Sequence, residues 1–373
     1  MTFLIVTGKF GMGHYSAARS LAQQIEEKFP QSQVRVVDFL EYALPELSRT
    51  IYRGFELLVN RGTGFYNRVY HITDNGRIGN RPFFQRYLLG KMGELIFQTK
   101  PTVLLSTLPL CSQLVSCYKK RYSDSLPLVT CITDVTSHCE WINDFTDCYL
   151  VASPSVRRQL VAKGVKEERI CVGGIPVKGE FVPAHPAGRT GERRLLIMGG
   201  GLGLLPKSME FYRQLDAMPG VQTTIITGNN HTLYERLRDQ YPSIQVVGYT
   251  DRVYEYMAGA DLILTKPGGI TLFETICTEL PMLVIRPYLP QEIANGRFIT
   301  ENQIGRVMNC SLEDSLDGSL EQIRELLYND AALEGYRANI RRFKSQLQPD
   351  AVAWILRSVL WKEHTERFRI HAA

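Results

Sequence analysis

Short apolar runs alternate with helix-like stretches along this chain of 373 residues, and the whole alternation occurs twice. Buried strands that alternate with helices are typical of a parallel sheet with helices on both faces. We therefore predict an α/β protein with two Rossmann-like, doubly wound lobes and a cleft between them. The strand-like runs lie at 3–7, 34–38, 102–106, 128–132 and 148–152 in the first half, and at 194–198, 223–227, 244–247, 261–265 and 282–285 in the second.

A segment rich in glycine and proline separates the two halves, which predicts a linker at 179–192. The N-terminal lobe is then expected at 1–178 and the C-terminal lobe at 193–348. We expect a last helix within 349–373 to pack back across the lobe junction. The apolar stripe predicted for this helix contains Trp354, Leu356, Val359 and Leu360. Ligands of such folds bind outside the carboxyl ends of the strands, so the binding site is expected in the cleft.

Composition indicates an ordinary globular chain, since 44% of residues are hydrophobic and 22% are charged. No apolar run reaches the roughly 18 residues that a spanning helix needs. The chain begins directly with a predicted strand, so we expect no signal peptide. The eight cysteines are irregularly spaced and form no CxxC pair, which favours reduced thiols in a cytoplasmic protein.

Positive charge is concentrated in the first half of the chain. Residues 1–178 hold 22 basic and 15 acidic residues, whereas 179–373 hold 21 and 23. The segment 49–100 alone holds nine basic residues, three acidic residues and nine aromatic residues. Cations and aromatic rings together suit an anionic membrane surface. They also suit single-stranded nucleic acid, or a solvated helix face above core aromatics.

The sequence Lys266-Pro267-Gly268-Gly269-Ile270-Thr271 joins a predicted strand to a predicted helix. Adjacent glycines at a helix N-terminus expose backbone N–H groups, and the helix dipole favours negative charge there. Glu274, one turn further on, could bind two hydroxyl groups of a sugar ring. Phosphate and ribose sites together suit a nucleotide, although a plain glycine turn with a surface glutamate would give the same pattern.

A second candidate lies after the first strand, where Gly8, Gly11, Gly13 and His14 open the first helix. The spacing is GxxGxG, which differs from the GxGxxG of dinucleotide-binding folds. A helix N-terminus lowers the pKa of a histidine, so His14 could stay neutral and act as a base. A capping role for His14 is the alternative.

Three further groups of residues follow other predicted strands. The loop that contains Gly200 and Gly201 could bind a diphosphate or could make a tight turn. Gln291, Glu292 and Asn295 could bind hexose hydroxyls or could form an ordinary first helical turn.

Asp134 and His138 could suggest a metal site. However, no third ligand lies at a usual spacing and the chain has no Asp-x-Asp sequence, so no metal is expected.

Taken together, these segments resemble the processive diacylglycerol glycosyltransferases of bacteria and the related monogalactosyldiacylglycerol synthases. The resemblance covers most of the chain. Its clearest parts are the Lys-Pro-Gly-Gly-Ile-Thr sequence at 266–271 and, after it, the Gln-Glu-x-x-Asn sequence at 291–295. The family usually has glycine where this chain has Pro290. Further matches are Gly11-Met12-Gly13-His14, Ala17-Ala18, 65–70, Thr133-Asp134, His138, Trp141, 147–152 and 173–177.

The resemblance implies a metal-independent, two-lobed enzyme of the GT-B type that uses no cofactor. It implies a UDP-hexose donor, inversion at the anomeric carbon, and a diacylglycerol acceptor at the inner face of the cell membrane. The basic-aromatic region would then dock on anionic lipid, with no nucleic-acid partner. His14 is the first candidate for the catalytic base and Asp134 the second. The UDP-sugar would contact Gly13, Gly200, Gly201, Tyr249, Pro267, Gly268, Gly269, Thr271, Glu274, Gln291, Glu292 and Asn295.

Other functions share parts of this pattern. A UDP-N-acetylglucosamine transferase acting on a polyprenyl-linked cell-wall precursor has the same kind of glycine loop. A UDP-sugar epimerase of the same fold would need no membrane-binding segment. An inactive lipid- or nucleotide-binding module is a further alternative. An NAD dehydrogenase fits least, because the first glycine spacing is wrong, although Asp38 follows the second predicted strand as such enzymes require.

Overall fold

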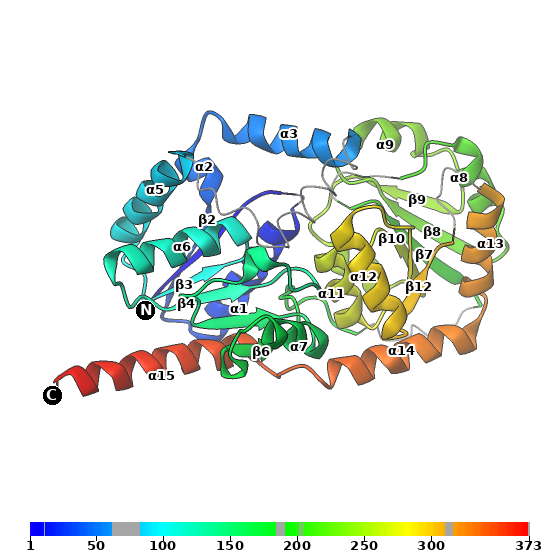
Figure 1. Cartoon of the computed structure of the whole chain (residues 1–373). Coiled ribbons are helices and arrows are strands. Elements are labelled where there is room, and N and C mark those ends of the chain that lie inside the picture. Colours follow the sequence, from blue (N-terminus) through cyan, green and yellow to red (C-terminus); the bar gives the residue numbers. More distant parts are fainter. Residues whose placement is uncertain are drawn as a thin grey trace. The chain divides into compact units, whose positions relative to one another are not determined.

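The computed structural model describes residues 1–10, 12–61, 83–183, 191–200, 203, 205–309 and 316–371 (Figure 1). The chain divides into two compact units. The first unit comprises Met1–Gly179 together with Gln346–Ala373, and the second comprises Glu180–Ser345. The final helix therefore belongs to the same unit as the N-terminus.

The first unit contains a six-stranded sheet with the order β2-β1-β3-β4-β5-β6, in which all neighbouring strands are parallel. The strands are β1 (Thr2–Thr7), β2 (Gln33–Asp38), β3 (Val103–Ser106), β4 (Leu128–Cys131), β5 (Cys148–Val151) and β6 (Ile170–Val172). The helices are α1 (Gly13–Lys28), α2 (Phe39–Ala43), α3 (Ser48–Arg61), α5 (Phe83–Thr99), α6 (Pro109–Tyr122), α7 (Pro154–Ala162) and α15 (Ala351–His371), with short 3-10 turns η1 (Cys139–Trp141) and η2 (Glu167–Arg169).

The continuous apolar runs of this unit reflect a sheet that is buried on both faces. In β1, Phe3 and Ile5 pack in a core with residues of α1 and α15. Leu4 and Val6 point to the opposite face and pack with residues of α5 and α6. Successive side chains of a strand point to opposite faces, so a strand covered on both sides must be apolar throughout.

The second unit repeats the scheme with the order β12-β11-β10-β7-β8-β9, again entirely parallel. In chain order this is the doubly wound 3-2-1-4-5-6 arrangement. Its strands are β7 (Arg193–Met198), β8 (Val221–Ile226), β9 (Ile244–Val247), β10 (Leu262–Thr265), β11 (Met282–Val284) and β12 (Gly305–Val307). Its helices are α8 (Met209–Asp216), α9 (His231–Leu237), α10 (Val253–Ala258), α11 (Gly269–Thr278), α12 (Pro290–Glu301), α13 (Leu316–Leu327) and α14 (Asp330–Lys344).

The ten strands predicted from the sequence are confirmed to within two residues at each end. Two strands were missed, β6 and β12, and each is only three residues long and lies at the edge of its sheet. Within the described part of the chain, no helix combines the length and the apolar character that crossing a bilayer requires. Much of the predicted basic-aromatic region, at 62–82, lies outside the described residues.

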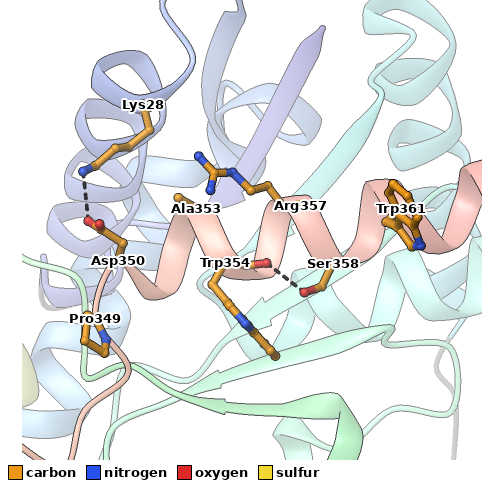
Figure 2. Close-up of a pocket in the computed structure, with 8 residues that line it drawn as sticks. All are labelled: Lys28, Pro349, Asp350, Ala353, Trp354, Arg357, Ser358 and Trp361. Atoms are coloured by element: carbon orange, nitrogen blue, oxygen red, sulfur yellow. Dashed lines mark hydrogen bonds and ion pairs between the residues drawn. The ribbon is translucent and has the colours of Figure 1, made fainter.

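The predicted apolar stripe of α15 needs one correction. Leu356 and Val359 are buried and Leu360 packs against the same core, but Trp354 is 44% exposed. Helical residues advance by about 100° each, so Trp354 and Leu356 point in nearly opposite directions and cannot share a stripe. Figure 2 shows Trp354 beside Ser358 on the side of the helix that lines a surface groove.

This arrangement predicts unequal effects on stability of two substitutions in α15. Leu356→Ala removes a fully buried side chain from the core, so it should lower the free energy of unfolding by about 2–5 kcal/mol. Trp354→Ala, although it removes a larger group, should cost about 1 kcal/mol or less because the ring is largely outside the core. Urea denaturation of both variants gives the comparison. If Trp354→Ala lowered the free energy of unfolding as much as Leu356→Ala or more, α15 would have to pack through its other face.

Candidate active site

The first group of candidate residues lies where β1 and β3 are neighbours. The helix after β1 packs on one face of the sheet and the helix after β3 on the other. Where the helices that follow two neighbouring strands cover opposite faces of a sheet, a crevice forms at the carboxyl ends of those strands. The Thr107 hydroxyl, just after β3, is 2.7 Å from the Thr7 hydroxyl and 3.0 Å from the backbone oxygen of His14. Thr107 therefore holds the start of α1 against the sheet.

His14 is the second residue of α1, and its side chain has a defined partner. Its Nδ1 is 2.7 Å from the Thr133 hydroxyl, which follows β4. The Trp141 ring, in η1, lies 6.1 Å from the imidazole between centroids. Gly13 is the first residue of the helix, and Met12 precedes it in the left-handed conformation (φ 66°) without a side-chain cap. Gly11 lies outside the described residues.

Asp134 acts on His14 through its charge. Burial lowers the pKa of His14, and the nearby Asp134 carboxylate partly opposes this by stabilising the imidazolium. Burial likewise raises the pKa of Asp134, against the attraction of His14 and His138 and a side-chain hydrogen bond from Trp141. A neutral imidazole beside a carboxylate can accept a proton and keep the resulting charge stable. The structure thus brings the first and second candidates for the base into one group.

Sequence reasoning missed Thr107 as a functional residue and named Thr133 only as part of a motif. Both are buried hydroxyl residues at the carboxyl ends of strands. A polar residue that ends an apolar run is the signal that would have indicated them, because strand ends in a parallel sheet share one edge.

The second group lies at the corresponding position of the second unit, where β7 and β10 are neighbours. Gly200 follows β7 in the left-handed region (φ +72°), and a methyl group there would lie 3.7 Å from Lys266 Cε. The loop after β7 therefore passes close to the loop after β10. Gly201 lies outside the described residues, whereas Gly203 has φ +62° and no room for a side chain against the Thr227 carbonyl.

Helix α11 begins at Gly269 with Gly268 as its N-cap, and no side chain caps it. The first-turn N–H groups of Gly269, Ile270 and Thr271 lack partners inside the helix, as at every helix start. With the helix dipole they form a site suited to phosphate. Pro267 is buried beneath this turn, while Thr271 and Glu274 are half-buried.

Residues that follow β11 hold this glycine turn in place. Asn295 is 1% exposed and donates from Nδ2 to the Pro267 carbonyl at 2.8 Å. Its Oδ1 accepts no hydrogen bond from any residue that the structure describes. Glu292 forms an ion pair with Lys266 at 3.0 Å. The Asn295 nitrogen thus holds the glycine turn, its oxygen is buried, and Glu292 already has a cationic partner.

The remaining predicted residues also follow the carboxyl ends of strands in the second sheet. Gln291 is half-buried in the first turn of α12, beside Glu292. Tyr249 follows β9, the outermost strand, and is 63% exposed. The structure thus places Gly200, Lys266, Gly268 and Asn295 close together, and Tyr249 two strands away from β7.

Two observations concern other candidate sites. Among the described residues, no three His, Cys, Asp or Glu side chains lie close enough to hold a metal ion. A groove of about 640 Å³ in the first unit is lined by residues of α15, by Pro349 and Asp350 just before it, and by Lys28, and it contains none of the predicted site residues (Figure 2).

The geometry around His14 makes a prediction about its pKa. His14 should titrate below its ordinary value of 6.5, because burial disfavours the imidazolium. Asp134→Asn should lower the pKa further, since it removes the negative charge that favours protonation. NMR titration of protein labelled at histidine measures both values, with the His14 signal identified by its absence in His14→Gln.

Glu140→Gln is the matched control for this titration. It removes a carboxylate that lies 3.7 Å from His138 Nδ1 rather than one beside His14, so the His14 pKa should not change. A His14 pKa that stays constant or rises in Asp134→Asn would contradict the proposed electrostatic link.

Comparison with known proteins assigns a family model to each unit. Residues 14–177 match the monogalactosyldiacylglycerol (MGDG) synthase model, and residues 197–338 match the glycosyltransferase family 28 C-terminal domain. The chain is 27% identical to the processive diacylglycerol beta-glucosyltransferase of Staphylococcus carnosus, over 88% of this chain and 85% of that protein. It is 28% identical to the enzyme of the same name from Bacillus subtilis, over 91% and 90% of the two chains.

The fold is also that of solved glycosyltransferases. The crystal structure of Acinetobacter baumannii MurG superposes with a TM-score of 0.64 over 96% of this chain and 98% of its own, at 14% identity. This likeness shows the GT-B architecture of two parallel-sheet, Rossmann-like units. The chain therefore belongs to the GT-B glycosyltransferases that join an MGDG synthase domain to a family 28 C-terminal domain.

Proposed function

We propose that the protein transfers a hexose from a UDP-hexose to diacylglycerol, with inversion at the anomeric carbon. The observation that carries this proposal is the pair of family matches, one in each unit, each of which contains one of the two groups of site residues. The names of the relatives, which describe diacylglycerol beta-glucosyltransferases aligned over most of the chain, support the acceptor.

In this proposal the second unit binds the donor. The α11 N-terminus, through Gly268, Gly269 and Thr271, binds the diphosphate, with Gly200 and Lys266 beside it. Glu274 binds the ribose and the backbone at Tyr249 meets the uracil. Asn295, together with Gln291 and Glu292, binds hexose hydroxyls. Gly13 and Gly201 are further proposed contacts of the donor.

The first unit supplies the base. When Nδ1 of His14 donates to Thr133, Nε2 is free to take the proton from the acceptor hydroxyl. The hydroxyl oxygen then forms a bond to C1 of the hexose while the bond from C1 to the phosphate oxygen breaks. UDP leaves with that electron pair, and its charge is stabilised by the helix dipole and Lys266. Asp134 stabilises the imidazolium, and this displacement inverts C1.

Attachment to the membrane surface is part of the same proposal. In α5, Phe97 is 76% exposed, and in α3, Leu57 is 56% exposed. Arg53 and Arg86 are exposed on these two helices. Exposed apolar side chains with cations suit the interface of an anionic bilayer, so we propose peripheral binding at the inner face of the membrane.

A transfer assay tests the proposed function. Purified protein with radiolabelled UDP-glucose or UDP-galactose and diacylglycerol in anionic vesicles should yield a labelled glycolipid. EDTA should leave the rate unchanged, because the proposed mechanism stabilises the diphosphate with backbone dipoles and Lys266. A parallel reaction contains UDP-N-acetylglucosamine and a polyprenyl-linked precursor. Product in that reaction alone would reject the proposed acceptor, and loss of activity in EDTA would reject metal independence.

His14→Ala should reduce kcat by at least about a hundredfold, because general-base catalysis contributes roughly 10²–10⁴-fold. The affinity for UDP, measured by calorimetry, should not change, since the imidazole of His14 is not among the proposed UDP contacts. His231→Ala removes an exposed histidine at the start of α9 and is the matched control, with unchanged kcat expected. Near-normal kcat in His14→Ala would assign the base to another residue.

A further inference from the structure

The loop that connects β1 to His14 rests on helix α3. The backbone N–H of Lys9 donates to the Tyr52 hydroxyl at 3.1 Å. The Phe10 ring packs edge-on against the rings of Tyr52 and Phe55, with centroids 4.9 and 5.0 Å apart. A methyl group at Gly8 would lie 3.4 Å from the same Tyr52 hydroxyl. Three successive loop residues therefore lie against one face of α3.

The Tyr52 hydroxyl is itself anchored to the sheet. It donates to Asp38 Oδ1 at 2.6 Å, and Asp38 is the last residue of β2, the strand next to β1. The same oxygen accepts from the N–H groups of Leu40 and Glu41, both at 3.1 Å, and so caps α2. Asp38 is 8% exposed, and its other oxygen lies 3.9 Å from Lys9 Nζ. Asp38 is thus occupied with internal contacts rather than available to a dinucleotide.

Burial and the neighbouring Asp38 carboxylate raise the pKa of Tyr52. The hydroxyl therefore keeps its proton at neutral pH, and it donates to Asp38 while accepting from Lys9. A tyrosine that does both links the end of β2 to the loop after β1 by two hydrogen bonds in series.

These contacts complete the set that holds His14. Thr107 binds its backbone oxygen and Thr133 its imidazole, from the ends of β3 and β4. Both of those contacts are made to His14 itself, within the first turn of α1. The hydrogen bond from Lys9 to Tyr52 lies five residues upstream of His14, where the chain leaves β1.

We propose that Tyr52 is a positioning residue for the reaction: through Lys9 it holds the entry to α1, and with it the His14 imidazole, in register with Thr133 and Asp134. The inference rests on the proposed function, because it assumes that His14 is the base. Misplacement of a catalytic group by even 1 Å can cost about a hundredfold in rate, so a hydrogen bond that locates its loop affects kcat. Tyr52 itself need not touch either substrate.

Tyr52→Phe tests this proposal because it removes only the hydroxyl. The ring contacts with Phe10 and Phe55 remain, and Asp38 keeps its two bonds to the backbone of α2. Tyr87→Phe is the matched control. Tyr87, on α5, donates to the Ala43 carbonyl at 3.0 Å in the same unit, away from the His14 loop.

In Tyr52→Phe, kcat should fall about tenfold while KM for the UDP-sugar stays within a factor of two. Hydrogen exchange of the backbone amides at 8–10 and 12–16 should become faster. Tyr87→Phe should change neither measurement, even if both variants lose similar thermal stability. Equal effects of the two variants on kcat, or wild-type kcat and wild-type exchange in Tyr52→Phe, would overturn the proposal.

The two proposals fail in different ways. If the wild-type protein transfers no hexose to any lipid, the proposed function is wrong, and hydrogen exchange alone then decides whether Tyr52 holds the loop. If the wild-type protein is active and Tyr52→Phe matches it in kcat and exchange, only the role of Tyr52 is refuted.

Discussion

Parallel pairing at two strand junctions determines where the candidate site residues of this protein lie. Between β1 and β3, and again between β7 and β10, the helices that follow neighbouring strands cover opposite faces of the sheet. The loops above such a junction cannot be covered by either helix, so their backbone stays accessible to a ligand. His14 follows one junction, and Lys266 and Gly268 follow the other. Each unit thus contributes one site, built on the same geometric principle.

Hydrogen bonds from uncharged side chains give these sites their geometry. Thr107 and Thr133 hold His14, and Asn295 holds the carbonyl of Pro267. A single bond of this kind contributes only about 1 kcal/mol to the stability of a fold. These hydrogen bonds matter more for position than for stability, because each one fixes a proton acceptor or a row of N–H groups relative to the sheet. Charges contribute as well: Asp134 favours the protonated form of His14, and Glu292 pairs with Lys266.

Most of the fold could be predicted because its signals are local. Ten strands were found from apolar runs, and the glycine turns marked the loops after β1, β7 and β10. The strands β6 and β12 escaped because three residues are too few to form a recognisable run. Trp354 was assigned to the wrong face of α15 because an apolar residue at the surface looks the same in sequence as one in the core. The residues proposed for UDP-sugar binding were identified from glycine patterns and from a family resemblance, and their roles stay predictions.

The fold class, the succession of strands and helices along the chain, and the residues with suitable chemistry could all be predicted from the sequence, because these depend on side-chain type and on short spacings. Which of those residues lie near one another could be read only from the folded chain. His14 and Asp134 are 120 positions apart, and Tyr52 reaches Lys9 across 43. Contacts between such distant positions follow from the spatial order of the strands in each sheet and from helix packing, which no local pattern encodes. A parallel sheet brings the carboxyl ends of its strands to one side, so residues far apart in the chain become neighbours there.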